Sequence, residues 1–288
     1  MADGSPPSPE AVFVGAAIAR TVSALVARST LDDVDPGAVT LVGLAAATVV
    51  VLVVCLVRAT RARRMPATAR SPRFEVVAFG LAVGATAVCT ALALDRLPAR
   101  EASALLFAGP VLLAASRVRS IVHAGAVALS AIGVVLVTGV HNGDGRAIAL
   151  LLGASGAWTI LIVAGRRVAR APQSWSGLAG ALVIAVLVAV PFGVSHIDDV
   201  YDQPRVLALA CVVGVLGSAI ALSLDLHVLG RVPTDRFGVL VVLIPVVAGF
   251  FAYIALDESP TAPDVVGAVV IVAAIVLDAV RRSPASPG

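Results

Sequence analysis

The sequence predicts an all-α polytopic membrane protein, with ten transmembrane helices in two inverted five-helix repeats and both termini in the cytoplasm. Three observations predict this class. Of the 288 residues, 59% are hydrophobic and 14% are charged, whereas soluble domains hold about 45–50% apolar and about 25% charged residues. The apolar residues form ten runs, each long enough to cross a bilayer. The arginines gather at alternate ends of these runs. A soluble enzyme and a disordered chain are therefore excluded.

The ten runs leave room only for short connections, so no extramembrane domain is expected. The candidate spans are residues 10–28, 37–57, 74–94, 99–116, 120–140, 146–165, 175–194, 206–229, 236–255 and 263–280. Most of these runs are apolar on every side, as helices surrounded by lipid are. The first run is the weakest candidate because Arg20 interrupts it.

The positions of the arginines orient the chain. All 21 basic residues are arginine. With the N-terminus inside, fifteen of them fall in inner connections and five in outer ones, and every inner connection carries at least two. This excess follows the positive-inside rule and predicts cytoplasmic termini. Because topology explains the basic charge, the expected partner is the lipid bilayer, and no nucleic acid is expected. A composition rich in Ala, Val and Arg is typical of a GC-rich bacterial genome, so we expect a multi-pass protein of the bacterial cytoplasmic membrane.

An internal repeat relates the two halves of the chain. Arg96-Leu97-Pro98 precedes Gly109-Pro110, and Arg231-Val232-Pro233 precedes Ile244-Pro245, at a constant offset of 135 residues. The repeat predicts one unit over residues 1–140 and a second over 141–288. Pro110, with its neighbour Gly109, and Pro245 each interrupt a span, because proline removes a helix hydrogen bond. Broken helices in corresponding halves of transporters point to the substrate site. Five spans per unit is an odd number, so the units are inverted and alternating access is expected.

Asp225 is the strongest candidate for a residue that acts on a solute. On a regular helix, Gly214, Ser218, Ala221 and Asp225 share one small and polar face, and such a face is expected to point into the bundle. Asp225 is interpreted as a contact for an ammonium group or as a proton carrier, and Ser218 as its polar neighbour. The alternative is a carboxylate that reaches headgroup water from the inner third of the span.

Arg20 is the second candidate. A charged side chain near the middle of a span must face the interior or extend to the membrane surface. One interpretation is a contact for a substrate carboxylate, because arginine binds carboxylates through two parallel hydrogen bonds. The other is a shortened span with Arg20 near the interface. Gly80 and Gly84 form a small-residue face in the first half, which is interpreted as helix packing.

Several classes of site are missing from the sequence. It contains neither a phosphate-binding GxxxxGK[ST] motif nor a zinc-binding HExxH motif. Cys55, Cys89 and Cys211 lie singly in apolar runs, which argues against a disulfide or a zinc site. We therefore expect no catalytic residues, no metal and no cofactor, and energy from an ion gradient or from the solute's own gradient. The expected ligand is a small-molecule solute. The sequence leaves open whether the chain forms a homodimer.

Sequence motifs add a resemblance to a known family. The segments that carry it are Leu222-Ser223-Leu224-Asp225, residues 231–240 (RVPTDRFGVL), Pro245, Leu256-Asp257-Glu258, residues 165–170 (GRRVAR), Pro191-Phe192-Gly193 and Phe107-Ala108-Gly109-Pro110. Together they resemble EamA-domain transporters of the drug/metabolite transporter superfamily, and most closely the threonine and homoserine exporter branch, over roughly residues 90–280. The resemblance implies ten helices in two inverted repeats and export of amino acids or other small metabolites.

The chain departs from that branch at a few polar positions. Leu106 stands where the branch usually carries a glutamate, Leu222 where it carries an aromatic residue, and Asp225 where it carries a glutamate. The favoured function is a secondary exporter of small amino acids such as threonine and homoserine. Two alternatives stay open: an exporter of drugs or other metabolites, and a membrane partner subunit or sensor that does not transport.

Overall fold

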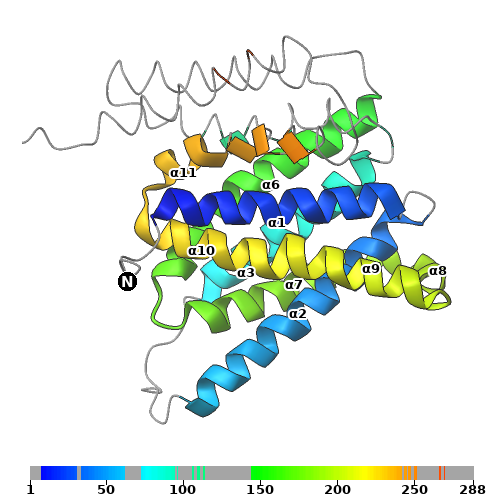
Figure 1. Ribbon diagram of the computed structural model, residues 1–288, viewed down its shortest axis with the longest axis horizontal. Coiled ribbons are helices and arrows are strands. Elements are labelled where there is room, and N and C mark those ends of the chain that lie inside the picture. The colour runs from blue at the N-terminus through cyan, green and yellow to red at the C-terminus, as the bar shows by residue number, and fades with distance from the viewer. Residues whose placement is uncertain are drawn as a thin grey trace, which may run out of the picture.

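The computed structural model describes nine stretches of helix around an apolar interior (Figure 1). It describes residues 8–30, 34–61, 73–94 and 144–241, together with isolated positions between 96 and 113 and between 243 and 269. The long helices are α1 (Pro9–Thr30), α2 (Pro36–Arg61), α3 (Arg73–Leu94), α6 (Gly145–Arg170) and α7 (Ser174–Gly193). The shorter α-helices are α8 (Ile197–Tyr201), α9 (Pro204–Gly214), α10 (Ala221–Arg231) and α11 (Thr234–Val241). A 3₁₀ turn (Val194–His196) joins α7 to α8.

Six membrane-spanning candidates lie in the described part of the chain. They cover Pro9–Ala27, Pro36–Thr60, Arg73–Leu94, Gly145–Arg170, Ser174–Tyr201 and Pro204–Arg231. Each corresponds to one of the predicted spans. Of the other four predicted spans, 236–255 begins as α11, 99–116 and 263–280 are described at isolated positions, and 120–140 lies outside the described residues. The number of ten helices therefore stays a prediction.

Helix starts follow the prolines. α1, α2 and α9 begin at Pro9, Pro36 and Pro204, where the fixed backbone angle of proline suits the first helical residue and its missing N–H costs no bond. At the start of α1, the Ser8 hydroxyl accepts a hydrogen bond from the Ala11 amide. At the start of α2, the Asp35 carboxylate accepts one from the Ala38 amide at 2.8 Å. These side chains satisfy amides that the first helical turn leaves unpaired.

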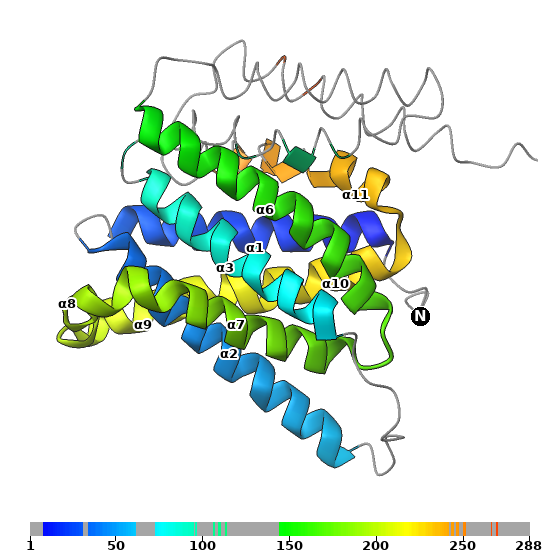
Figure 2. The same ribbon diagram turned by 180° about the vertical axis from the view of Figure 1, so that it is seen from behind.

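The helices pack in two groups. In the first, α3 lies against α6 and α7; in the second, α1 lies along α9 and α10 (Figures 1 and 2). α2 connects the groups by packing against α7 and α9, and α6 connects them by packing against α3 and α10. Gly80 and Gly84 of α3 face α7, where a Cβ at Gly80 would lie 2.6 Å from the Ala181 carbonyl oxygen. The interpretation of this glycine pair as helix packing is confirmed.

Large apolar side chains also cover the outside of the bundle. Val49, Leu56 and Leu187 are at least 60% exposed, and many similar residues accompany them on the helix surfaces. A water-soluble monomer rarely exposes such a surface, whereas a bilayer solvates it. The exterior therefore agrees with the six spanning helices.

One predicted span is not a regular α-helix. Residues 206–229 were expected as one continuous helix, but a π-helical turn (Val215–Ile220) separates α9 from α10. A π turn shifts the hydrogen bonding by one residue, so side chains before and after it lose the 100° phase that α geometry assigns. The shared face predicted from Gly214 to Asp225 assumed that phase, which this turn interrupts. Gly214, Ala221 and Asp225 are nevertheless buried and Ser218 is half-buried, and Gly214 lies against Gly43 of α2.

Candidate functional site

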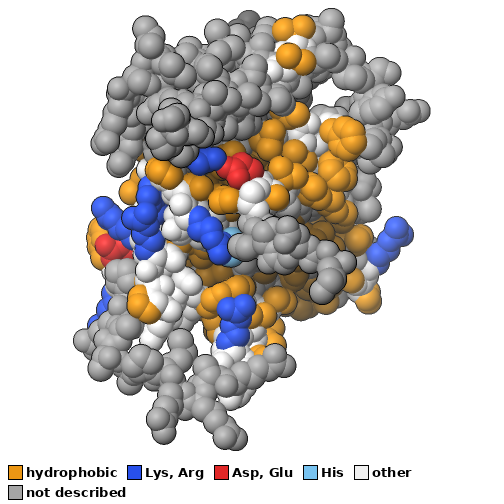
Figure 3. All heavy atoms as spheres, turned by 60° about the vertical axis from the view of Figure 1, so that its left-hand side comes forward, with side chains coloured by type: hydrophobic (Ala, Val, Ile, Leu, Met, Phe, Trp, Pro, Cys, Tyr) orange, Lys and Arg blue, Asp and Glu red, His pale blue; other side chains and the backbone are white. Residues whose placement is uncertain are grey.

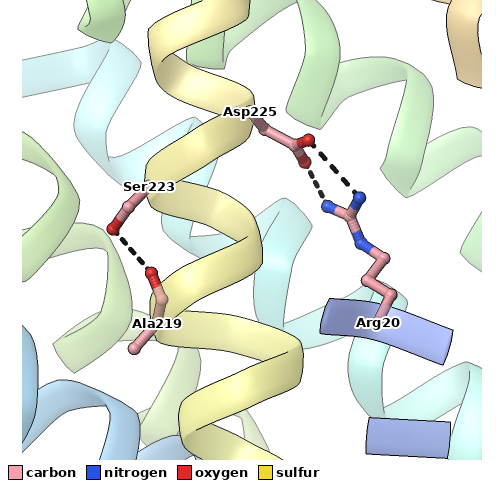
Figure 4. Close-up of polar contacts among 4 residues, drawn as sticks. All are labelled: Arg20, Ala219, Ser223 and Asp225. Carbon is pink, nitrogen blue, oxygen red and sulfur yellow. Dashed lines mark hydrogen bonds and ion pairs between the residues drawn. The ribbon is translucent and has the colours of Figure 1, made fainter. Parts of the chain in front are cut away.

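The centre of the site is an ion pair between α1 and α10. Arg20 donates from both terminal nitrogens to Asp225, with Nη1 at 3.4 Å from Oδ1 and Nη2 in contact with Oδ2 (Figure 4). The Asp225 side chain is 2% exposed and that of Arg20 is 19% exposed. Two parallel bonds from a guanidinium fix both the distance and the plane of the carboxylate. The pair thus joins α1 to α10 at one point inside the bundle.

A third helix covers the guanidinium. The Arg20 Cζ atom lies 5.9 Å from the ring centroid of Trp158 on α6, within the range of a cation–π contact. Trp158 is 6% exposed, so its ring closes one side of the site. Trp158 is therefore part of the wall of the site beside a charge.

Both charged candidates face the interior, which is one of the two placements that the sequence analysis allowed for Arg20. α1 runs through Arg20 without a break and holds a candidate span over Pro9–Ala27, which favours a full span; the shortened span stays the alternative. The alternative for Asp225, a carboxylate in headgroup water, is wrong, because this side chain is buried. What the sequence did not predict is that the two residues are each other's partners.

Ser218 lies apart from this pair. It is half-buried in the π-helical turn, and a different serine makes the polar contact there. The Ser23 hydroxyl of α1 donates to the Val213 carbonyl at 2.8 Å, directly before the π turn. A Cβ at Gly217 would lie 2.6 Å from that hydroxyl oxygen. Ser23 lies three residues after Arg20 on α1, so the two side chains share a face of the helix. This spacing could have indicated Ser23 as a polar neighbour of Arg20, and the sequence analysis did not use it.

Gly109 and Pro110 pack on α6 close to Trp158. The Gly109 amide donates to Ser155 Oγ at 2.6 Å, and Pro110 is buried. Ser155 and Trp158 are three residues apart on α6 and share a face. The predicted helix-break position therefore lies one turn of α6 from the ring that covers Arg20. Pro245, the matching position in the second half, lies outside the described residues.

A second ion pair joins α1 to α11. The Arg236 guanidinium contacts Glu10 in the first turn of α1, and both side chains are partly exposed. Beside it, the rings of Phe13 and Phe237 meet edge to face at 5.3 Å between centroids, and both are fully buried. Glu10, Phe13 and Arg20 lie on one side of α1 by their spacing. One side of α1 is therefore attached to α10 and α11 at two levels.

A further ion pair joins α3 to α6. Glu75, in the first turn of α3, contacts Arg167 of α6 at 3.9 Å between Oε1 and Nη1. The contact joins the start of α3 to the end of α6.

Comparison with known proteins gives three findings. Residues 145–278 match the EamA-like transporter family. The threonine/homoserine exporter RhtA of Salmonella typhimurium LT2 is 30% identical over 222 residues, which is 75% of each chain. RhtA of Escherichia coli K12 is 31% identical over 197 residues, or 67% of this chain and 66% of that one. A crystal structure of another protein, 19% identical, superposes with a TM-score of 0.77 over 95% of this chain and 98% of that chain, which is a likeness of fold.

Proposed function

Since this chain belongs to the EamA-like transporter family of the drug/metabolite transporter superfamily, we propose that it exports small amino acids, threonine and homoserine first, by alternating access. Family members are transporters rather than enzymes, and the six apolar helices make this chain a multi-pass protein of the bacterial inner membrane. The substrate follows the names of the similar exporters. The observation that carries the proposal is the buried pair of Arg20 and Asp225.

The chemistry of the pair fits a zwitterion. An α-amino acid carries one carboxylate and one ammonium group a few bonds apart. Its carboxylate can replace Asp225 at the Arg20 guanidinium, and its ammonium can replace Arg20 at the Asp225 carboxylate. The total charge of the site then stays unchanged, so neither protein charge is left buried without a partner, a state that is strongly destabilising. A cation or an anion alone leaves one of the two residues unpaired.

The position of the pair fits alternating access. Arg20 belongs to the predicted first repeat (1–140) and Asp225 to the second (141–288). A solute that separates the two residues weakens one of the attachments between α1 and α10. The contacts of Glu10 with Arg236 and of Phe13 with Phe237 form a layer between the ion pair and one end of the bundle. For a solute to leave the ion pair through that end, this layer must open.

The orientation of the bundle follows its arginines. The end that carries the C-termini of α2, α6 and α10 comes forward in Figure 3, where arginine side chains gather on the surface. We assign this end to the cytoplasm on the positive-inside rule. The layer of Glu10, Phe13, Arg236 and Phe237 then lies on the cytoplasmic side of the ion pair, because α1 begins at this end.

Transport from preloaded proteoliposomes tests the proposal. Vesicles are loaded with labelled threonine, homoserine or serine, or with a lipophilic cationic drug, and efflux is followed with and without a pH gradient. Threonine methyl ester, which lacks the carboxylate charge, and N-acetylthreonine, which lacks the ammonium, probe each half of the pair. We expect threonine and homoserine to leave these vesicles faster than they leave vesicles without protein. Both blocked analogues are expected to leave slowly.

Matched variants connect the result to the pair. The double variant Arg20→Gln/Asp225→Asn is expected to lose amino-acid efflux. Arg96→Gln/Asp144→Asn removes an ion pair that is exposed and is expected to keep it. Equal efflux of threonine and its methyl ester would overturn the zwitterion argument, and efflux of the drug alone would make this a drug exporter. No efflux of any solute would favour the second candidate, a partner subunit or sensor, which rests on the apolar Leu106 at a position where the exporter branch carries a glutamate.

A further inference from the structure

A separate cavity of about 300 Å³ opens at the arginine-rich end of the bundle. Its walls come from the end of α6 at Ala169, the first turn of α7 at Ser174 and Trp175, and one face of α10 at Ser223, His227 and Arg231. This end lies forward in Figure 3, where arginine side chains gather on the surface. The cavity thus lies where three helices reach one end of the molecule.

The cavity lies on the other side of α10 from the ion pair. Ser223, His227 and Gly230 follow one another at spacings of four and three residues, so they share a face of the helix. Asp225 is displaced by two residues from Ser223, which is roughly 200° around an α-helix. Figure 4 shows Ser223 and Asp225 pointing away from each other. A solute held between Arg20 and Asp225 therefore does not contact the cavity.

The lining of the cavity favours an anion. Arg231 and His227 are exposed at its edge, and no acidic side chain is among its described lining residues. The Arg58 guanidinium, at the end of α2, lies 4.3 Å from the centre of the Trp175 ring, so a second arginine is held beside the cavity wall. No side chain caps the first turn of α7, whose amides add hydrogen-bond donors at the positive end of a helix dipole.

We propose that this cavity binds a phosphate group, with Arg231 as its principal ligand. A guanidinium and the Ser174 hydroxyl can donate to several acceptor oxygens of a phosphate, whereas the Ser223 hydroxyl on the wall of the cavity donates to the Ala219 carbonyl oxygen. The group can belong to an anionic phospholipid of the cytoplasmic leaflet or to a soluble phosphate compound. Basic pockets between spanning helices on the cytoplasmic side are suited to lipid headgroups, and the apolar Leu178 and Leu226 in the same lining can contact the glycerol and upper acyl region.

Lipid binding to the full chain tests the proposal. The purified protein in detergent is titrated with phosphatidylglycerol, with phosphatidylcholine or with inorganic phosphate, and bound lipid is counted by native mass spectrometry. For each ligand, the shift in apparent melting temperature is also measured. We expect one tightly held phosphatidylglycerol, and binding about tenfold weaker in Arg231→Gln, as expected for loss of a charged hydrogen bond. Arg205→Gln changes an exposed arginine at the start of α9 and serves as the matched control.

Each result decides the proposal. Preferential retention of phosphatidylglycerol that Arg231→Gln alone weakens supports a lipid headgroup. Stabilisation by inorganic phosphate, again lost only in Arg231→Gln, supports the same site with a soluble ligand. Equal binding by the wild type, Arg231→Gln and Arg205→Gln would overturn it, as would no preference for either phosphate ligand over phosphatidylcholine. Because binding is measured without transport, failure here leaves the exporter proposal intact, and failure of transport leaves this one intact.

Discussion

Arg20 and Asp225 are 205 positions apart in the sequence and form a two-pronged ion pair inside the bundle. Each residue therefore neutralises the other in a region where an isolated charge is expensive. The arrangement also gives the bundle a polar contact that can be exchanged for a solute. Under the proposed function, stability and transport depend on the same two side chains, and the two properties can be separated by comparing single with double substitutions.

Removing one partner of this pair is expected to destabilise the protein more than removing both. Arg20→Gln or Asp225→Asn leaves a buried charge without its partner, which costs about 3–5 kcal/mol. Arg20→Gln/Asp225→Asn leaves two neutral amides and is expected to recover most of that loss while transport stays absent. Apparent melting temperatures in detergent measure the effect. Additive losses in the double variant would contradict the pairing.

The exposed pair of Arg96 and Asp144 supplies the control for this experiment. Their side chains are 47% and 42% exposed, and exposed pairs contribute about 0–1 kcal/mol. Arg96→Gln and Arg96→Gln/Asp144→Asn are therefore expected to change the melting temperature little. Asparagine at position 144 can still accept from the Arg146 amide, as Asp144 does at 3.0 Å, so the start of α6 keeps its cap.

Hydropathy predicted the spans because a helix that crosses lipid must be apolar along nearly its whole length. The predicted starts at 10, 37 and 206 lie within two residues of the observed starts at Pro9, Pro36 and Pro204. The same argument showed that Arg20 and Asp225 must each find a polar environment. It could not pair them, because hydropathy contains no information about which helices become neighbours.

The π turn escaped prediction for a related reason. Its sequence, residues 215–220, is as apolar as the helix on either side, so hydropathy gives no mark of the changed hydrogen bonding. The features that accompany it come from other helices: Ser23 donates to the Val213 carbonyl, and Gly43 lies against Gly214. Contacts between distant segments therefore accompany this local geometry, which sets the direction in which Asp225 points.

Gly214→Ala is expected to destabilise the contact between α2 and α9. A Cβ at Gly214 would collide with the backbone of Gly43, which has no flexible end that can move aside. Overpacking of this kind costs about 1–3 kcal/mol. Gly153→Ala on α6 is the matched control, because a Cβ there meets nothing within 4 Å. Thermal unfolding of the two variants should separate them; a Gly214→Ala protein as stable as Gly153→Ala would contradict the close approach.

Substitutions around Gly109 are expected to differ according to what they remove or add. Ser155→Ala removes the acceptor of the Gly109 amide, a loss of about 1 kcal/mol for a typical hydrogen bond. Gly109→Ala adds a Cβ that would collide first with the Ser155 backbone carbonyl oxygen, and that would lie 2.5 Å from Thr159 Oγ1 and 2.7 Å from Ser155 Oγ. It is therefore expected to lower the melting temperature more than Ser155→Ala. In Gly109→Ala/Ser155→Ala the hydroxyl is absent but the carbonyl oxygen stays, so little recovery is expected; a melting temperature that returned to that of Ser155→Ala would show that the serine side chain, and not the backbone, sets the limit.

Linking α1 to α11 is expected to stop transport. Phe13 and Phe237 meet edge to face, so cysteines at both positions, in a background without Cys55, Cys89 and Cys211, can be joined by a short thiol-specific cross-linker. If this layer must part during each cycle, cross-linked protein loses exchange of labelled threonine to about background, and a reductant that cleaves the linker restores it. His196→Cys/Asp199→Cys, an i,i+3 pair at the opposite end of the bundle, controls for the reagent, because a link within one turn restrains no movement between helices. Exchange that continues at the wild-type rate in fully cross-linked Phe13→Cys/Phe237→Cys protein would place the moving layer elsewhere, while leaving the role of Arg20 and Asp225 to be judged by their own variants.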